Sequence, residues 1–188
     1  MSLRLLLLSS LFAILTAVSS MFIIPLPFVP ITLQVAVVLL SGLLLGAKGG
    51  AISQAFYVLL GLIGLPVFIG GVGGIQHIFS PTFGFLIGFI AAAATTGLFA
   101  RYAKSFYSCL FACFAGIVAM YTIALPLLFV NLKYVVGMDI GFVRLLQIGL
   151  LPFLIPDILK ACAAAAVAVR LKGINNIYDK NDKREYIK

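Results

Sequence analysis

The sequence predicts an all-α membrane protein with six transmembrane helices, on three observations. Of the 188 residues, 63% are hydrophobic and 10% are charged, whereas soluble domains carry roughly 25% charged residues. The apolar character runs nearly from end to end, which excludes a soluble domain with one anchor. Clusters of glycine and proline divide the chain, and its length suits about six spans of roughly 20 residues. We expect residues 1–171 to form one domain in the cell membrane and residues 172–188 to form a polar cytoplasmic tail.

The first helix is expected at residues 3–24. Its apolar run follows Arg4 but is too long for the core of a signal peptide, and no small-residue cleavage site follows it, so we expect it to be retained. Ala13 and Ala17 have the small-xxx-small spacing that lets another helix approach closely. The residues leave open whether that helix belongs to this protein or to a partner.

A proline-rich stretch at residues 25–34 follows. Pro25, Pro27 and Pro30 prevent a continuous helix. Non-helical backbone at membrane depth has to be covered by protein. We therefore expect this stretch to fold over the helices as a lid, with Phe28 as an apolar wall of a ligand pocket.

Two short helices are expected at residues 32–45 and 51–62, with a glycine-rich turn at 46–50 between them. Both are short for a hydrocarbon core of about 30 Å, so oblique packing or extension into the glycine turns must complete them. Their polar members, which are candidate ligand contacts, are Gln34, Ser53, Gln54 and Tyr57.

The loop at residues 61–81 holds six glycines and two prolines but no formal charge. It lacks the Gly-Lys-Ser/Thr ending of a phosphate-binding loop. Glycine lets backbone approach a ligand closely, and an apolar loop is poorly solvated as a mere connector. We favour a ligand cap over a flexible connector, with Gly73 and Phe79 as candidate contacts.

The charge distribution predicts the topology of the remaining helices, expected at residues 82–99, 106–129 and 145–169. With the N-terminus in the cytoplasm, ten of the 13 lysines and arginines fall on the cytoplasmic side, and only Lys133 and Arg144 fall outside. This distribution predicts that both termini are cytoplasmic and that the two apolar loops cap an outward-facing pocket.

Asp157 and Lys160 are the charges that no loop or tail accommodates. They lie three residues apart in a long uncharged stretch, and a charge at membrane depth costs a few kcal/mol, so it usually faces a protein interior. Pro152 and Pro156 are expected to kink the helix, which would restart near Pro156 and place Asp157 at its positive end. The pair either neutralises itself or recognises a polar ligand with its spare hydrogen-bonding capacity.

Several functions are excluded or disfavoured. The net charge of +8 sits at segment ends, which suits anionic lipid headgroups rather than nucleic acid. Cys109, Cys113 and Cys162 lack neighbouring histidines or carboxylates, so we interpret them as packing residues rather than metal ligands. No serine and histidine lie at matching depths in the membrane, where they could form a catalytic pair. We therefore expect that the protein is not an enzyme and binds no cofactor. The pocket suits a small, mainly apolar ligand with a few polar points.

Five stretches, in chain order, carry a resemblance to a known family. They are Pro30-Ile31-Thr32-Leu33-Gln34, Gly42-Leu43-Leu44-Leu45-Gly46, the run from Tyr57 to Phe68, Gly70-Gly71-Val72-Gly73-Gly74, and Asp157-Ile158-Leu159-Lys160-Ala161. Together they resemble the BioY family, the biotin-specific substrate-binding components of energy-coupling factor (ECF) transporters. The chain departs from that pattern at Phe83 and Phe85, where a glycine and a tyrosine are expected.

The resemblance implies a six-helix subunit that captures biotin and works with a transmembrane coupling protein and two ATP-binding subunits. Ala13 and Ala17 resemble the AxxxA motif with which such components dock on the coupling protein. Asp157 is then expected to accept a hydrogen bond from a ureido N–H of biotin, and Lys160 is expected to donate a hydrogen bond to a biotin oxygen. Gln34 and Gln54 would supplement them.

Two alternatives of other classes remain at this point. A stand-alone facilitator or secondary carrier would move a small vitamin without ATP-binding subunits. A structural membrane protein would need no ligand pocket. This alternative would be excluded if a ligand raised the thermal stability of the protein.

Overall fold

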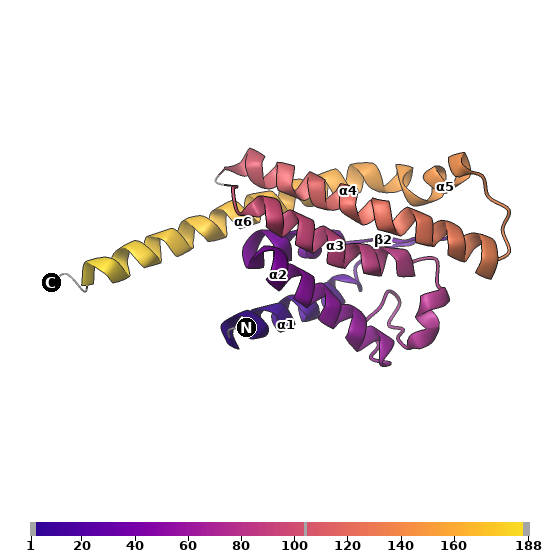
Figure 1. Ribbon diagram of the computed structural model, residues 1–188, viewed down its shortest axis with the longest axis horizontal. Helices are drawn as coiled ribbons and strands as arrows, with labels where there is room; N and C mark the ends of the chain where they lie inside the picture. Colours follow the sequence, from indigo (N-terminus) through magenta and orange to yellow (C-terminus); the bar gives the residue numbers. More distant parts are fainter. Residues whose placement is uncertain (1–2, 104, 186–188) are drawn as a thin grey trace.

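The helices of the computed structural model lie roughly along its long axis (Figure 1). The structure describes the backbone of residues 3–103 and 105–185, and side chains up to residue 171. The helices are α1 (Leu3–Ser19), α2 (Gln34–Leu62), α3 (Phe83–Ala100), α4 (Phe106–Val130), α5 (Phe142–Gly149) and α6 (Leu151–Glu185). The shorter elements are β1 (Ile23–Ile24), β2 (Ile31–Thr32), a 3-10 turn η1 (Ile75–Phe79) and a π-helical turn η2 (Asn131–Val135).

Four of the described helical stretches are long and apolar enough to cross a membrane. They are residues 34–62, 83–100, 106–135 and 142–171, and α1 is a shorter apolar helix beside them. The protein is therefore helical and suited to a multi-pass arrangement, as the composition predicts.

Helix α2 doubles back on itself at Gly46. This glycine has φ 73° and ψ −179°, which no helix contains, and only glycine adopts that conformation at little cost. The side chains of Gln34 and Tyr57 are 2.7 Å apart, although 23 residues of straight helix would separate them by about 34 Å. The halves 34–45 and 47–62 are therefore antiparallel. The turn is Gly46 alone, and the second half begins before the expected Ala51.

Small residues set the spacing between the central helices. A methyl group on Gly97 of α3 would overlap the backbone of Gly46 and Ala47 at the turn of α2. On the other side of α3, Gly84 and Gly88 leave room for the backbone of α4 at Ala124 and Met120. The backbones approach closely because no side chain stands between them, which is the usual way that membrane helices gain packing energy. Helix α3 is consequently the centre of the bundle.

The first helix ends earlier than the sequence predicts, at Ser19 rather than at residue 24. Ile23 and Ile24 instead form strand β1, which pairs antiparallel with Ile31 and Thr32 of β2. The reason is Pro25, because a residue that precedes proline is forced toward extended backbone. The proline-rich stretch is thus a small hairpin.

The last predicted helix is two helices, α5 and α6, separated at Leu150. The expected restart near Pro156 is wrong: α6 begins at Leu151, Pro152 lies in its first turn, and Pro156 lies inside it. A proline in the first turn needs no hydrogen-bond partner for its nitrogen, so the break falls before Pro152. Asp157 therefore lies in the second turn of α6.

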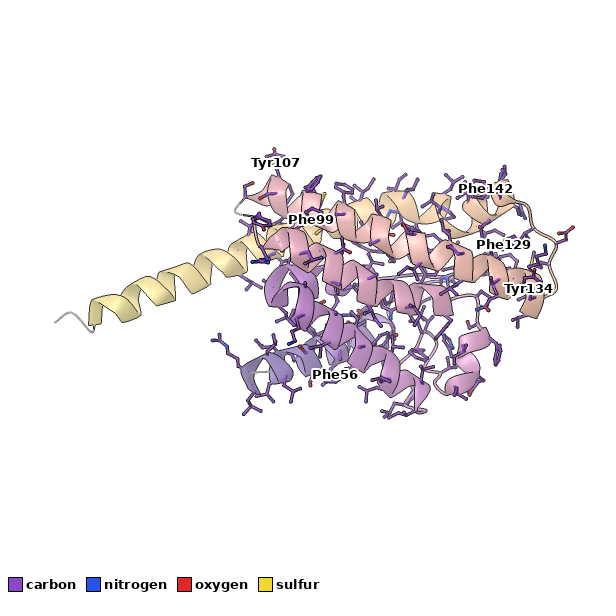
Figure 2. All side chains as sticks on the ribbon, viewed as in Figure 1. Phe56, Phe99, Tyr107, Phe129, Tyr134 and Phe142 are labelled. Carbon is purple, nitrogen blue, oxygen red and sulfur yellow. The ribbon has the colours of Figure 1, made fainter. Side chains whose placement is uncertain are left out.

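The two ends of the bundle carry aromatic side chains. Phe99 and Tyr107 lie at one end, and Phe129, Tyr134 and Phe142 lie at the other (Figure 2). Aromatic residues favour the boundary between membrane and water. Both chain termini lie toward the Phe99 end, beyond which the C-terminal half of α6 projects (Figure 1).

The close approach at Gly97 predicts a large cost for a small substitution. Gly97→Ala should lower stability by about 1–3 kcal/mol, because backbone atoms rather than a flexible side chain oppose the added methyl group. Thermal unfolding in detergent measures this. Leu98→Ala is the control, since Leu98 is 54% exposed and should change stability by less than about 0.5 kcal/mol. Equal effects of the two substitutions would contradict the packing argument.

Candidate ligand pocket

A narrow pocket lies in the middle of the helices, below the two apolar loops. It encloses about 420 Å³ of space, including its mouth. Loop residues that line it are Val29, Pro30, Thr32, Ile69 and Thr82, and helical residues that line it are Gln34, Val35, Phe85, Leu86, Phe89, Met120, Tyr121, Phe153, Asp157 and Lys160. Most of these are apolar, and the polar ones converge from α2, α4 and α6.

Asp157 and Lys160 form a buried ion pair in this pocket. Lys160 Nζ donates to Asp157 Oδ1 over 2.8 Å. Lys160 is 8% exposed and Asp157 is 2% exposed. Tyr121 of α4 donates from its hydroxyl to the other oxygen, Oδ2, over 2.6 Å. The carboxylate is therefore held from two helices. A lysine has three N–H donors and a carboxylate about four acceptor positions, so the pair retains capacity for a ligand.

A second polar cluster closes the pocket near the start of α2. The side-chain nitrogen of Gln34 donates to the hydroxyl of Tyr57 over 2.7 Å, and Thr32 donates to the side-chain oxygen of Gln34 over 3.0 Å. The Tyr57 hydroxyl in turn donates to the carbonyl of Val67, 3.3 Å away. Gln34 lines the pocket, whereas Tyr57 lies behind it and ties α2 to the glycine-rich loop.

Gln54 lies apart from the pocket. Its side chain is fully buried and within 3.4 Å of Thr16, Ser41 and Ser53. These contacts join α1 to both halves of α2, which indicates a packing role for the amide in this structure.

The remaining predicted site residues are also outside the pocket lining. Phe28 is partly buried against the core, Phe79 is 62% exposed, and Gly73 packs on the backbone of Leu65. Ala13 is 1% exposed and Ala17 is partly buried. Ala13 thus faces the chain's own helices, and Ala17 lies at the edge of that buried face. The outward side of α1 carries Leu7, Leu11, Ile14, Leu15 and Val18.

The glycine-rich loop is attached to the helices at two points. The ring of Phe68 packs on Gly61, where any Cβ would overlap it, and meets Tyr57 edge-on with ring centres 5.7 Å apart. At the other attachment, Asn131 donates to the carbonyls of Ile78 and Ser80 over 3.1 and 2.7 Å. The position of the loop therefore depends on its contacts with α2 and with the end of α4.

Sequence reasoning missed the pocket residues of α3 and α4. Met120 and Tyr121 are two of them, and Phe85 and Phe153 add an aromatic wall with ring centres 6.0 Å apart. Helical spacing alone would have indicated that Ile117, Tyr121 and Ala124 share a buried face. It would not have indicated that this face meets Asp157. Within the described side chains, no group of histidine, cysteine and acidic residues could hold a metal ion.

The fold and the pocket define a class of protein: a helical membrane protein with one acid–base pair buried in an apolar pocket, as expected of a small-molecule binding protein. The sequence model of the BioY family matches residues 1–176. The chain therefore belongs to the BioY family.

Similar proteins agree with this assignment. The chain is 40% identical over 164 residues to a probable biotin transporter BioY of Lysinibacillus sphaericus, covering 86% of this chain and 83% of that one. It is 38% identical to the biotin transporter BioY of Thermotoga maritima, covering 87% and 93%. The crystal structure of an S-component for biotin from an ECF-type ABC transporter superimposes with a TM-score of 0.77 at 25% identity, covering 90% and 91%.

His77 gives a pH-dependent prediction for the loop. Its ring lies on Phe68 with ring centres 4.6 Å apart and its Nε2 is 3.1 Å from the Thr82 hydroxyl. Burial lowers the pKa of His77 below its ordinary value. The unfolded chain therefore binds more protons, so stability present above about pH 6.5 is lost as the pH falls.

We expect the thermal midpoint in detergent to fall between about pH 7.5 and about pH 5.5. The fall should be shallower in His77→Gln, which keeps a polar side chain but does not titrate. Parallel pH profiles for the two proteins would show that His77 does not contribute.

Proposed function

We propose that this protein captures biotin from outside the cell as the membrane-embedded S-component of an ECF-type importer. The observation that carries this proposal is the ion pair of Asp157 and Lys160, buried in an apolar pocket of a BioY-family chain. Its relatives named biotin transporters and the similar S-component for biotin support the choice of ligand.

The chemistry of the pocket fits biotin. The ureido group carries two N–H donors and a carbonyl acceptor, which match the acceptor positions of Asp157 and the free donors of Lys160. The sulfur ring and aliphatic chain suit the apolar wall, to which Phe85, Met120 and Phe153 contribute. Gln34 supplies a further amide in the lining of the pocket. Gln54, Tyr57, Phe28, Phe79 and Gly73 would then act by shaping the helices and the loops around the ligand.

Ligand entry requires the cover to open. The loop residues Val29, Pro30, Thr32 and Ile69 line the pocket on one side. The pocket lies under β2 and the glycine-rich loop, so these two segments have to move for biotin to enter and then close over it. Neither segment carries a formal charge, which suits a cover that contacts an apolar ligand.

The arrangement of charges supports six spans with both termini in the cytoplasm. The turn at Gly46 packs on Gly97, and the basic residues Arg4, Lys48 and Arg101 belong to that end of the molecule. Lys133 lies over Phe129 at the opposite end, where fewer basic residues are found. Because cytoplasmic ends are enriched in lysine and arginine, the pocket mouth and the two loops face outward. The doubled α2 then counts as two of the six spans.

The partners follow from the same proposal. The chain would dock on a transmembrane coupling protein that works with two ATP-binding subunits. Ala17 retains part of its surface and lies beside exposed side chains of α1, whereas Ala13 is buried. We place the docking surface on this side of α1. The chain itself would have no catalytic role and no bound cofactor. Residues 172–188 form the polar cytoplasmic end.

The first test separates a ligand-recognition role of the ion pair from a purely structural one. Asp157→Asn and Lys160→Ala should each weaken biotin binding by roughly tenfold to a hundredfold, since a hydrogen bond to a charged group contributes about 1.5–3 kcal/mol. Calorimetric titration in detergent measures the affinity.

The double variant Asp157→Asn with Lys160→Met provides the control. It removes both charges while it keeps the shape, so it avoids the cost of one unpaired buried charge, which is about 3–5 kcal/mol. We expect its thermal stability to be close to the parent and its biotin binding to be lost. Recovery of both stability and binding would mean that the pair is only structural.

The second test concerns the coupling protein. Ala17→Leu should reduce biotin transport in vesicles that contain the coupling protein and the ATP-binding subunits, because a larger side chain prevents close helix approach. Biotin binding in detergent should stay within about twofold of the parent, since Ala17 does not line the pocket. Transport that persists without the other subunits would favour a stand-alone carrier instead.

A further inference from the structure

Tyr121 lines the pocket beside the ion pair of Asp157 and Lys160. It is the only tyrosine among the described residues that line the pocket. Its hydroxyl donates to Asp157 Oδ2 over 2.6 Å, whereas Lys160 holds Oδ1. The two oxygens of one carboxylate are therefore held by two different helices, α4 and α6.

The two contacts have different consequences for Asp157. Lys160 follows Asp157 by three residues on the same helix, so their contact alone leaves the carboxylate free to turn about its own bond to Cβ. The Tyr121 contact comes from a neighbouring helix and fixes the plane of the carboxylate. Because the tyrosine uses its one O–H as the donor, its oxygen remains an acceptor, and it adds to the acceptors that a ligand N–H meets.

Tyr121 is itself held in place. It is 7% exposed, and its ring meets Phe85 edge-on, with ring centres 6.1 Å apart and planes at 86°. Phe85 has no hydroxyl and contributes only its ring. The contact with Phe85 therefore sets the direction of the Tyr121 hydroxyl without competing for Asp157.

A second hollow, on the other side of Tyr121, is a place toward which the Asp157 carboxylate could turn instead of toward the pocket. It is an apolar groove between α4 and α6 with a wide opening, and it contacts both Tyr121 and Asp157. Its walls include Val118, which is 65% exposed, and Ile158, which is 43% exposed. Tyr121 thus stands between the pocket and this apolar groove. Without this contact, Lys160 alone would orient the carboxylate.

We propose that Tyr121 is a positioning residue that holds the Asp157 carboxylate toward the pocket. It thereby makes the site selective for cyclic ligands with an unsubstituted N–H beside a carbonyl. This inference rests on the proposed function, because it assumes that Asp157 accepts from the ligand. It deepens that function by assigning part of the ligand selectivity to a residue of α4.

The test compares biotin with two derivatives, each methylated on one ureido nitrogen. In the parent, the derivative blocked at the N–H that faces Asp157 should bind more weakly than biotin. In Tyr121→Phe we expect biotin binding to weaken about tenfold. Binding of the blocked derivative should change less than about twofold, so the selectivity falls. Calorimetric titration of all three ligands measures this.

The controls separate positioning from stability. Tyr107→Phe removes a hydroxyl from the same helix at a residue that is 80% exposed, and its affinities should match the parent. Tyr121→His keeps a ring N–H that can donate to Asp157 and should recover most of the selectivity. In an Asp157→Asn background, Tyr121→Phe should have little further effect on biotin binding.

Two results would overturn the inference. A Tyr121→Phe protein with lower thermal stability but unchanged selectivity would show that the hydroxyl is only structural. Tyr121→His that folds but remains as unselective as Tyr121→Phe would show that the donor to Asp157 is not what matters. Failure of the proposed function looks different, because Asp157→Asn would then bind biotin like the parent. If Asp157→Asn loses affinity while Tyr121→Phe does not, only the role of Tyr121 is refuted.

Discussion

The buried ion pair of Asp157 and Lys160 is the interaction on which the pocket depends. Placing either charge alone in the middle of a membrane protein is costly, so each has to be satisfied by the other or by neighbours. The pair meets this requirement with contacts from α6 itself and from Tyr121 of α4. These contacts hold α4 and α6 together at the pocket and leave donors and acceptors facing an otherwise apolar space. One arrangement therefore serves both the fold and the recognition of a ligand.

Glycine residues determine how closely the helices around the ion pair pack. Glycines at positions 42, 84, 88 and 97 let α2, α3 and α4 approach through their backbones. Such packing is rigid, because backbone atoms cannot move aside as a flexible side chain does. The pocket is thus lined by fixed walls on α2, α3 and α4. The hairpin of β1 and β2 and the glycine-rich loop are the non-helical segments beside these walls.

The cover is itself attached to those walls. Phe68 packs on Gly61, and Asn131 bonds the backbone of the loop from the end of α4. A cover fixed at both ends explains why the pocket is narrow. In the proposed function, biotin enters when the cover shifts, and its burial between cover and ion pair provides the affinity. The coupling protein would act from the opposite side of the membrane, where the turn at Gly46 and the chain termini lie.

The sequence by itself determined the membrane class, the approximate positions of the helices, and the placing of Asp157 and Lys160 on one helix face, because hydropathy, proline, glycine and charge act locally. It also placed Gln34 among the candidate contacts, and Gln34 does line the pocket. Only the tertiary structure decided that Gln54 packs helices and that Tyr121 holds Asp157. These depend on which helix faces meet and how far each helix slides along its neighbour. Such contacts join residues 36 or 38 positions apart, and no local pattern encodes that distance.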